Sequence, residues 1–291
     1  MVISHRICCM RDVLLVLGRG VGQVMFQNNA FSGLLMWIGL LCNSWVLALL
    51  ALAGNAVSTF VAWLSGYSKE DIRDGLYGFN GTLVGIAIGV FFQLNPWTIG
   101  MLVLGAALST WIARAWMQQH RLPGFTAPFI VVVWLLLLGC VCFQSDWLLP
   151  SVQPVEQPTV QWFQAFSLNV GQVMFQGNVF SGLLFLAGIL VNAPLQAGYA
   201  VLGASLPLSM VFFMGGDYLS FNTGLFGYNG VLCALALGDR SISGCWWAIL
   251  AVVLSVVLQV VGMSCGITTL TAPFVLAVWI VLCVKQCCKQ R

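Results

Sequence analysis

Two glutamines in apolar surroundings are the residues whose type and placement most clearly suggest chemistry. Gln23 and Gln172 lie in VGQVMFQNNAFSGLL and VGQVMFQGNVFSGLL, which start 149 residues apart and share thirteen of fifteen positions. An amide within a membrane segment is energetically expensive unless it is hydrogen-bonded, so its presence needs a reason. It could bind a polar solute, or it could join two helices.

Two further motifs recur in the same order, which indicates that the chain consists of two copies of one unit. The recurring pairs are GLYGFNGTLVGIAIG at 75–89 with GLFGYNGVLCALALG at 224–238, and PGFTAPF at 123–129 with GITTLTAPF at 266–274. We assign the copies to residues 1–150 and 151–291. In an apolar chain, such a duplication is typical of transporters and channels whose site lies where the copies meet.

The composition identifies an integral membrane protein. Of 291 residues, 60% are hydrophobic and only 7% are charged, and the mean hydropathy is +0.97. Soluble domains carry about 25% charged residues. The apolar runs are too continuous for the alternating strands of a membrane β-barrel, so the lipid bilayer should surround an all-α polytopic fold.

Five apolar stretches in each copy predict five crossings, and an odd number inverts the second copy relative to the first. A full crossing needs about 20 residues, and two stretches of each copy are shorter. We therefore expect two inverted five-helix repeats with discontinuous or re-entrant half-helices around a central pore. The ten stretches are 31–42, 45–66, 80–93, 97–113, 125–144, 180–191, 197–215, 229–238, 244–262 and 271–284. Residues 11–30 and 160–179 could add tilted, partly inserted helices.

The basic residues predict the orientation. With a cytoplasmic N-terminus, all eleven Lys and Arg fall in cytoplasmic segments and the linker 145–165 is external, as the positive-inside rule requires. Both termini are then cytoplasmic. The eleven are Arg6, Arg11, Arg19, Lys69, Arg73, Arg114, Arg121, Arg240, Lys285, Lys289 and Arg291.

Several kinds of chemistry find no support in the sequence. No Cys/His set has zinc spacing, and no catalytic triad or metal-ligand group falls within one membrane layer. Asp74 and Asp217 lie at predicted loop edges, so no ionisable group is expected at mid-membrane, where ion-coupled carriers usually keep one. We expect no enzyme activity, no cofactor, no metal and no nucleic-acid partner.

The paired motifs resemble those of the urea transporter family across nearly the whole chain. The three family motifs correspond to Gly22–Leu34 with Gly171–Leu183, Gly75–Leu83 with Gly224–Leu232, and Leu122–Phe129 with Thr268–Phe274. Six copies in this order are highly specific. The family's Asn-Pro is Asn29–Ala30 and Asn178–Val179 here, and the second threonine motif lacks its Leu-Pro, so helix starts could differ slightly.

The resemblance implies a passive, channel-like facilitator of urea permeation through a flat neutral slot. Urea is planar and neutral, with N–H donors along two edges and one carbonyl acceptor. Matching motif positions place the slot walls at Phe26, Phe79, Phe175 and Tyr228, with Leu83 and Leu232 beside them. They place amide acceptors at Gln23 and Gln172, and they make Thr126 and Thr271 meet at the narrow centre. The resemblance further implies a homotrimer, and the compact chain favours the inner (plasma) membrane of a bacterium.

Other transport functions stay open at this point. A channel for formamide or acetamide is a close rival, because these amides share the planar edge of urea. An ion-coupled urea or amide transporter is disfavoured by the missing mid-membrane carboxylate. An ammonium channel would need mid-membrane histidines, whereas His5 and His120 fall in cytoplasmic segments. The paired NPA motifs of water channels are absent.

Overall fold

Every regular element that the structure describes is helical, which confirms the all-α polytopic class. The computed structural model describes residues 10–119, 121–143, 145–150, 159–215 and 218–289. Within these ranges, the only β pairing is an isolated bridge between Phe92 and Leu148. His5, Arg6, His120, Asp217 and Arg291, which entered the sequence analysis, lie outside the described residues.

The helices follow the same order in both halves of the chain. The first half contains α1 (Met10–Gln23), α2 (Ala30–Asn43), α3 (Trp45–Leu64), α4 (Lys69–Arg73), α5 (Gly78–Phe91), α6 (Pro96–Gln119) and α7 (Ala127–Cys142). The second contains α8 (Trp162–Gly171) with the short 3₁₀ helix η1 (Gln172–Met174), α9 (Val179–Asn192), α10 (Pro194–Phe213), α11 (Tyr218–Asn222), α12 (Tyr228–Leu237), α13 (Ile242–Ser264) and α14 (Ala272–Lys289). The division near residue 150 and the inversion of one half stay predictions.

Helix length separates full crossings from partial ones. Four helices are long and apolar enough to span a membrane: α3, α6, α10 and α13. The helices α2, α5 and α9 have 14 residues each and α12 has 10, so they rise only about 15–21 Å. Helices α8 and α9 are bent by 73° at their break. These four short segments lie where the sequence predicts them, but α7 and α14, which it predicts as full crossings, are also among the shorter apolar helices. Helices α1 and α8 are the additional helices that the sequence did not place.

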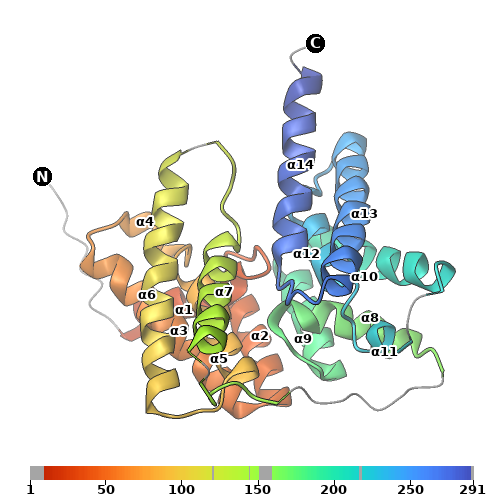
Figure 1. Ribbon diagram of the computed structural model, residues 1–291. Coiled ribbons are helices and arrows are strands. Elements are labelled where there is room, and N and C mark those ends of the chain that lie inside the picture. Colours follow the sequence, from red (N-terminus) through yellow and green to blue (C-terminus); the bar gives the residue numbers. More distant parts are fainter. Residues whose placement is uncertain (1–9, 120, 144, 151–158, 216–217, 290–291) are drawn as a thin grey trace, which may run out of the picture.

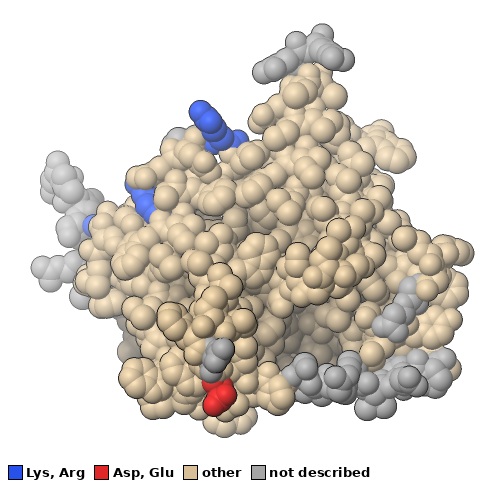
Figure 2. All heavy atoms as spheres, in the orientation of Figure 1, with Lys and Arg blue, Asp and Glu red and all other residues tan. Residues whose placement is uncertain are grey.

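The two halves lie side by side (Figure 1). The red to yellow-green helices α1–α7 occupy one side and the green to blue helices α8–α14 the other, with α2 packed on α9 and α7 on α14 between them. Charge is sparse on the visible surface. Figure 2 shows its basic side chains toward the upper end and an acidic side chain at the lower edge.

Glycines let the short helix of each half pack directly on a long one. A β-carbon added to Gly54 of α3 would lie 2.0 Å from the Gly81 carbonyl oxygen of α5, and one added to Gly203 of α10 would lie 2.5 Å from the Gly230 carbonyl oxygen of α12. Such backbone contact is how membrane helices gain packing energy in lipid. It buries α5 almost completely, with Gly81 to Ile88 all inaccessible.

We expect Gly54→Ala to destabilise the protein by about 1–3 kcal/mol, because the added methyl group overpacks this contact. The melting temperature in detergent should fall by about 3–10 °C. Gly100→Ala is the matched control, because Gly100 of α6 has no atom within 4 Å of an added β-carbon. That variant should be neutral or slightly stabilised. Equal melting temperatures for the two variants would contradict the packing assigned to α3 and α5.

Candidate functional site

Each repeated GQVMF segment ends a helix in a turn that forces phenylalanine into a left-handed conformation. The Gln27 N–H donates to the Gly22 carbonyl at 3.0 Å, and the Phe26 N–H donates to the Gln23 carbonyl at 3.1 Å. These bonds form the Schellman motif, whose left-handed position is usually glycine. Phe26 occupies it with φ 61°, and Phe175 occupies its equivalent with φ 60°. Such strain costs about 1–3 kcal/mol per residue and clusters at functional sites.

A backbone carbonyl from another segment of the same half holds each of the two glutamine amides. Gln23 Nε2 donates to the Asp74 carbonyl oxygen at 2.9 Å, and Gln172 Nε2 donates to the Thr223 carbonyl oxygen at 3.0 Å. A carbonyl can only accept, so each bond holds the NH₂ side of the amide against the backbone. The Oε1 atoms therefore face away from this backbone, where they can accept hydrogen bonds. Both side chains are only partly buried.

Thr126 and Thr271 meet between the two halves. Their Oγ1 atoms are 2.7 Å apart, and the residues are 3% and 2% exposed. Each threonine immediately precedes a helix, α7 or α14. The Thr126 hydroxyl makes no capping bond to α7. Both hydroxyls are thus available to each other and, because a hydroxyl donates and accepts, to a solute.

Two asparagines perform the capping that the threonines do not. Asn80 Oδ1 of α5 accepts from the Phe129 N–H of α7 at 3.1 Å, and Asn229 Oδ1 of α12 accepts from the Phe274 N–H of α14 at 3.1 Å. Helix starts leave such N–H groups without intrahelical partners. Each of these asparagines therefore caps a neighbouring helix and not its own.

A second pair of left-handed residues directly precedes the threonines. Phe125 has φ 46° and Leu270 has φ 49°. The asparagines hold these turns, because Asn80 Nδ2 and Asn229 Nδ2 lie 3.4 Å from the Phe125 and Leu270 carbonyl oxygens. Four strained residues in two equivalent pairs therefore surround the threonine contact.

Aromatic rings from both halves interlock around this contact. Phe26 packs edge-on against Phe125 at 5.8 Å and Phe274 at 6.2 Å, measured between ring centroids. Phe175 packs edge-on against Phe129 at 6.2 Å and Phe91 at 5.8 Å. Phe26 and Phe175, two of the four predicted wall residues, thus each touch the TAPF segment of the other half. Sequence reasoning missed Phe129 and Phe274, although both stand in the repeated TAPF motif.

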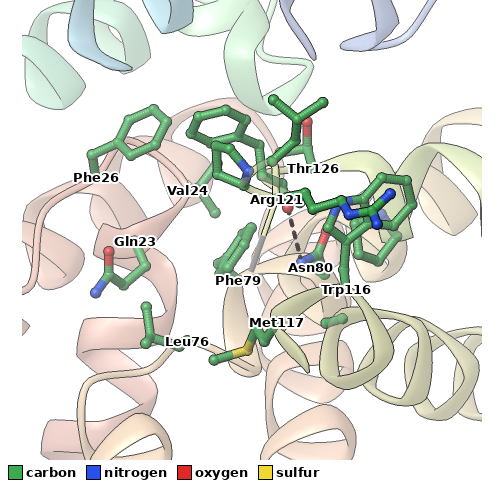
Figure 3. Close-up of a pocket in the computed structure, with 16 residues that line it drawn as sticks. Gln23, Val24, Phe26, Leu76, Phe79, Asn80, Trp116, Met117, Arg121 and Thr126 are labelled. Atoms are coloured by element: carbon green, nitrogen blue, oxygen red, sulfur yellow. Dashed lines mark hydrogen bonds between the residues drawn. The ribbon is translucent and has the colours of Figure 1, made fainter. Parts of the chain in front are cut away.

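A cavity of about 450 Å³ opens beside the threonines (Figure 3). Four of the predicted site residues line it: Gln23, Phe26, Phe79 and Thr126. The figure shows Gln23 and Phe26 facing Asn80, Trp116 and Arg121 across the hollow. Among the described residues that line the cavity, Arg121 is the only charged one.

The remaining predicted residues do not border this cavity. Leu83 and Leu232 are buried in the apolar core, at 0% and 1% exposure. Phe175 and Tyr228 belong to the same core. The second half has four residues at positions equivalent to those that line the cavity in the first half. They are Gln172, Phe175, Tyr228 and Thr271.

The two halves differ chemically at one point. The Tyr228 hydroxyl donates to the Leu270 carbonyl oxygen at 2.6 Å, whereas the corresponding Phe79 has no hydroxyl. Gln259 Oε1 extends this network by accepting from Thr269 Oγ1 at 2.8 Å and from Asn229 Nδ2 at 3.1 Å. The second half therefore carries a polar network at the position that Phe79 occupies in the first half.

Comparison with known proteins adds a family and relatives to this geometry. A family model described as urea transporter matches residues 14–286. A protein named urea transporter 1 from Rattus norvegicus is 29% identical over 248 residues, which cover 78% of this chain and 63% of the relative. One with the same name from Ovis aries is 28% identical over 287 residues, which cover 89% of this chain and 73% of the relative. The chain thus spans about two thirds to three quarters of the length of these relatives.

Proposed function

Because this chain belongs to the urea transporter family, we propose that it is a passive, channel-like facilitator of urea permeation across its membrane. The observation that carries the proposal is the contact between Thr126 and Thr271, whose hydroxyls lie 2.7 Å apart between two strained turns. Two separate asparagines cap the adjoining helices, so the threonine hydroxyls bond to each other, and a passing urea would replace this mutual bond.

The proposed path presents hydrogen-bond acceptors in sequence. Urea N–H groups would meet Gln23 Oε1, then the threonine hydroxyls, then Gln172 Oε1. The flat faces of urea offer no donors, and the rings of Phe26 and Phe175 would cover them. Weak, multiple contacts of this kind allow a solute both to enter and to leave.

Passive flux is supported by the lack of a carboxylate among the described residues that line the cavity, because ion-coupled carriers usually keep one at mid-membrane. Arg121 is the only charged residue among these described lining residues. Proteoliposomes with an imposed proton or sodium gradient should therefore equilibrate urea without accumulating it. Accumulation above the external concentration would replace the passive proposal with a coupled one. Faster flux of formamide than of urea would instead favour a general amide channel.

We expect Phe26→Ala to loosen selectivity more than it lowers urea flux. The change removes the ring that packs edge-on against both Phe125 and Phe274 and so widens the path on one side. Dimethylurea flux relative to urea flux should rise by about threefold or more. Burying an aromatic ring contributes a free energy of several times RT, so removing the ring can lower the barrier for the larger solute by at least this much. Phe31→Ala is the control, because Phe31 is 54% exposed on α2. An unchanged ratio in Phe26→Ala would remove this ring from the path wall.

The proposal includes a homotrimer in the inner membrane with both termini cytoplasmic. The trimer rests on family resemblance, and native mass spectrometry from lipid nanodiscs would test it. The orientation is supported by the basic side chains at one end of the molecule (Figure 2). An impermeant reagent added to intact cells should fail to modify a C-terminal tag, and modification would reverse the assignment.

A further inference from the structure

Two tryptophans outside the proposed path tie each half of the protein to the other. Trp134 Nε1 of α7 donates to the Thr268 carbonyl oxygen at 2.8 Å, and Trp279 Nε1 of α14 donates to the Pro123 carbonyl oxygen at 2.8 Å. The donors are 145 residues apart, and so are the acceptors. The two bonds are therefore equivalent and reciprocal, with each tryptophan reaching the turn of the opposite half.

These bonds bracket the threonine contact. Each tryptophan lies eight residues after the threonine of its own half, and each acceptor lies three residues before the threonine of the other half. Eight helical residues rise about 12 Å. We call each of these two hydrogen bonds a tryptophan latch. The latch from Trp279 holds the turn that carries Thr126, and the latch from Trp134 holds the turn that carries Thr271.

The membrane makes such bonds hard to break. Trp134 is 39% exposed, on a helix that the apolar chain places within the bilayer. In hydrocarbon, an indole N–H that loses its partner has no water to replace it, and neither has a carbonyl in an irregular turn. Each latch gives one indole N–H and one turn carbonyl a hydrogen-bond partner. Its rupture would leave two polar groups without partners.

We propose that Trp134 and Trp279 are positioning residues that set the separation of Thr126 and Thr271, and thereby the width of solute that passes. Neither indole is among the residues that line the cavity. They act through the turns at 123–126 and 268–271, whose left-handed residues are already strained. This inference rests on the proposed urea pathway and adds the means by which the pathway discriminates between solutes of different size.

The test measures permeability ratios in proteoliposomes that carry Trp134→Phe, Trp279→Phe or both. Phenylalanine keeps an aromatic ring but removes the donor. Trp134→Phe is the cleaner change, because Trp279 also stacks on Trp116 at 5.2 Å. We expect the methylurea-to-urea ratio to rise about two- to tenfold in each variant, the range of one net hydrogen bond, and further in the double variant.

Trp246→Phe is the matched control. Trp246 of α13 is 66% exposed, and its indole donates no hydrogen bond to any residue that the structure describes. The methylurea-to-urea permeability ratio of Trp246→Phe should equal that of the wild type. If the latch variants lose urea and methylurea flux in equal proportion, the tryptophans only stabilise the fold and the inference is wrong. If the wild type moves no urea, the proposed function itself fails, which is a distinguishable result.

Discussion

Thr126→Val should lower urea flux by about tenfold to a hundredfold in proteoliposomes while the protein stays folded. Valine keeps the shape of threonine but removes the hydroxyl that lies 2.7 Å from Thr271 Oγ1. At this buried contact, a urea N–H would lose an acceptor with no water to replace it. A buried unsatisfied donor costs about 1–3 kcal/mol, and each 1.4 kcal/mol is about a tenfold change in rate.

Thr126→Ser is the matched control, because serine keeps the hydroxyl and loses only a methyl group. It should retain most of the flux. Thr271→Val should reproduce the loss, since the two hydroxyls occupy equivalent positions. Normal urea transport by Thr126→Val, at an unchanged melting temperature, would show that the threonines are not the central constriction.

The second large effect is expected for Asn80→Ala. This change removes the acceptor for the Phe129 N–H and the donor for the Phe125 carbonyl. One buried and one partly buried backbone group then lack partners, and a buried unsatisfied group costs about 1–3 kcal/mol. We expect a melting temperature lower by about 5–15 °C, and a loss of urea flux per folded molecule because Thr126 is no longer held.

Two controls separate this role from general packing. Thr82→Val, on the same helix, removes only a bond from the side chain to the Gly78 carbonyl and should cost under about 1 kcal/mol. Asn229→Ala should be milder than Asn80→Ala, because the Tyr228 hydroxyl still bonds to the Leu270 carbonyl. An Asn80→Ala protein as stable as Thr82→Val would contradict capping across helices.

The helix pattern could be predicted because hydrophobic length and repetition are local properties. The motif in which the family has Asn-Pro illustrates this, because alanine or valine follows the asparagine here. Helices α2 and α9 still begin at Ala30 and Val179, directly after their asparagines. Asn29 Oδ1 accepts from the Phe31 and Ser32 N–H groups, so the cap sets the start of α2 without proline.

The geometry of the site depended on contacts that no local pattern contains. The left-handed conformations of Phe125 and Leu270 could not be predicted, because neither residue favours this conformation and the two differ in type. The Tyr228 network joins residues 41 and 42 positions apart. Gln23 and Gln172 were identified from the repeated motif, their apolar surroundings and the family resemblance, but the carbonyls that orient their amides were not. The roles assigned to these residues stay predictions.

The measurement that tests the central claim most directly is stopped-flow light scattering on proteoliposomes under an outward urea gradient, without any ion gradient. It should be run at about pH 5.5 and about pH 8.0, which bracket the ordinary histidine pKa near 6.5. His120→Gln should be measured alongside, because His120 adjoins the cavity residue Arg121 in sequence. The account predicts fast urea equilibration at the same rate at both pH values in both proteins. Flux no faster than that of empty liposomes would contradict urea permeation, and a pH response that persists in His120→Gln would contradict a neutral path.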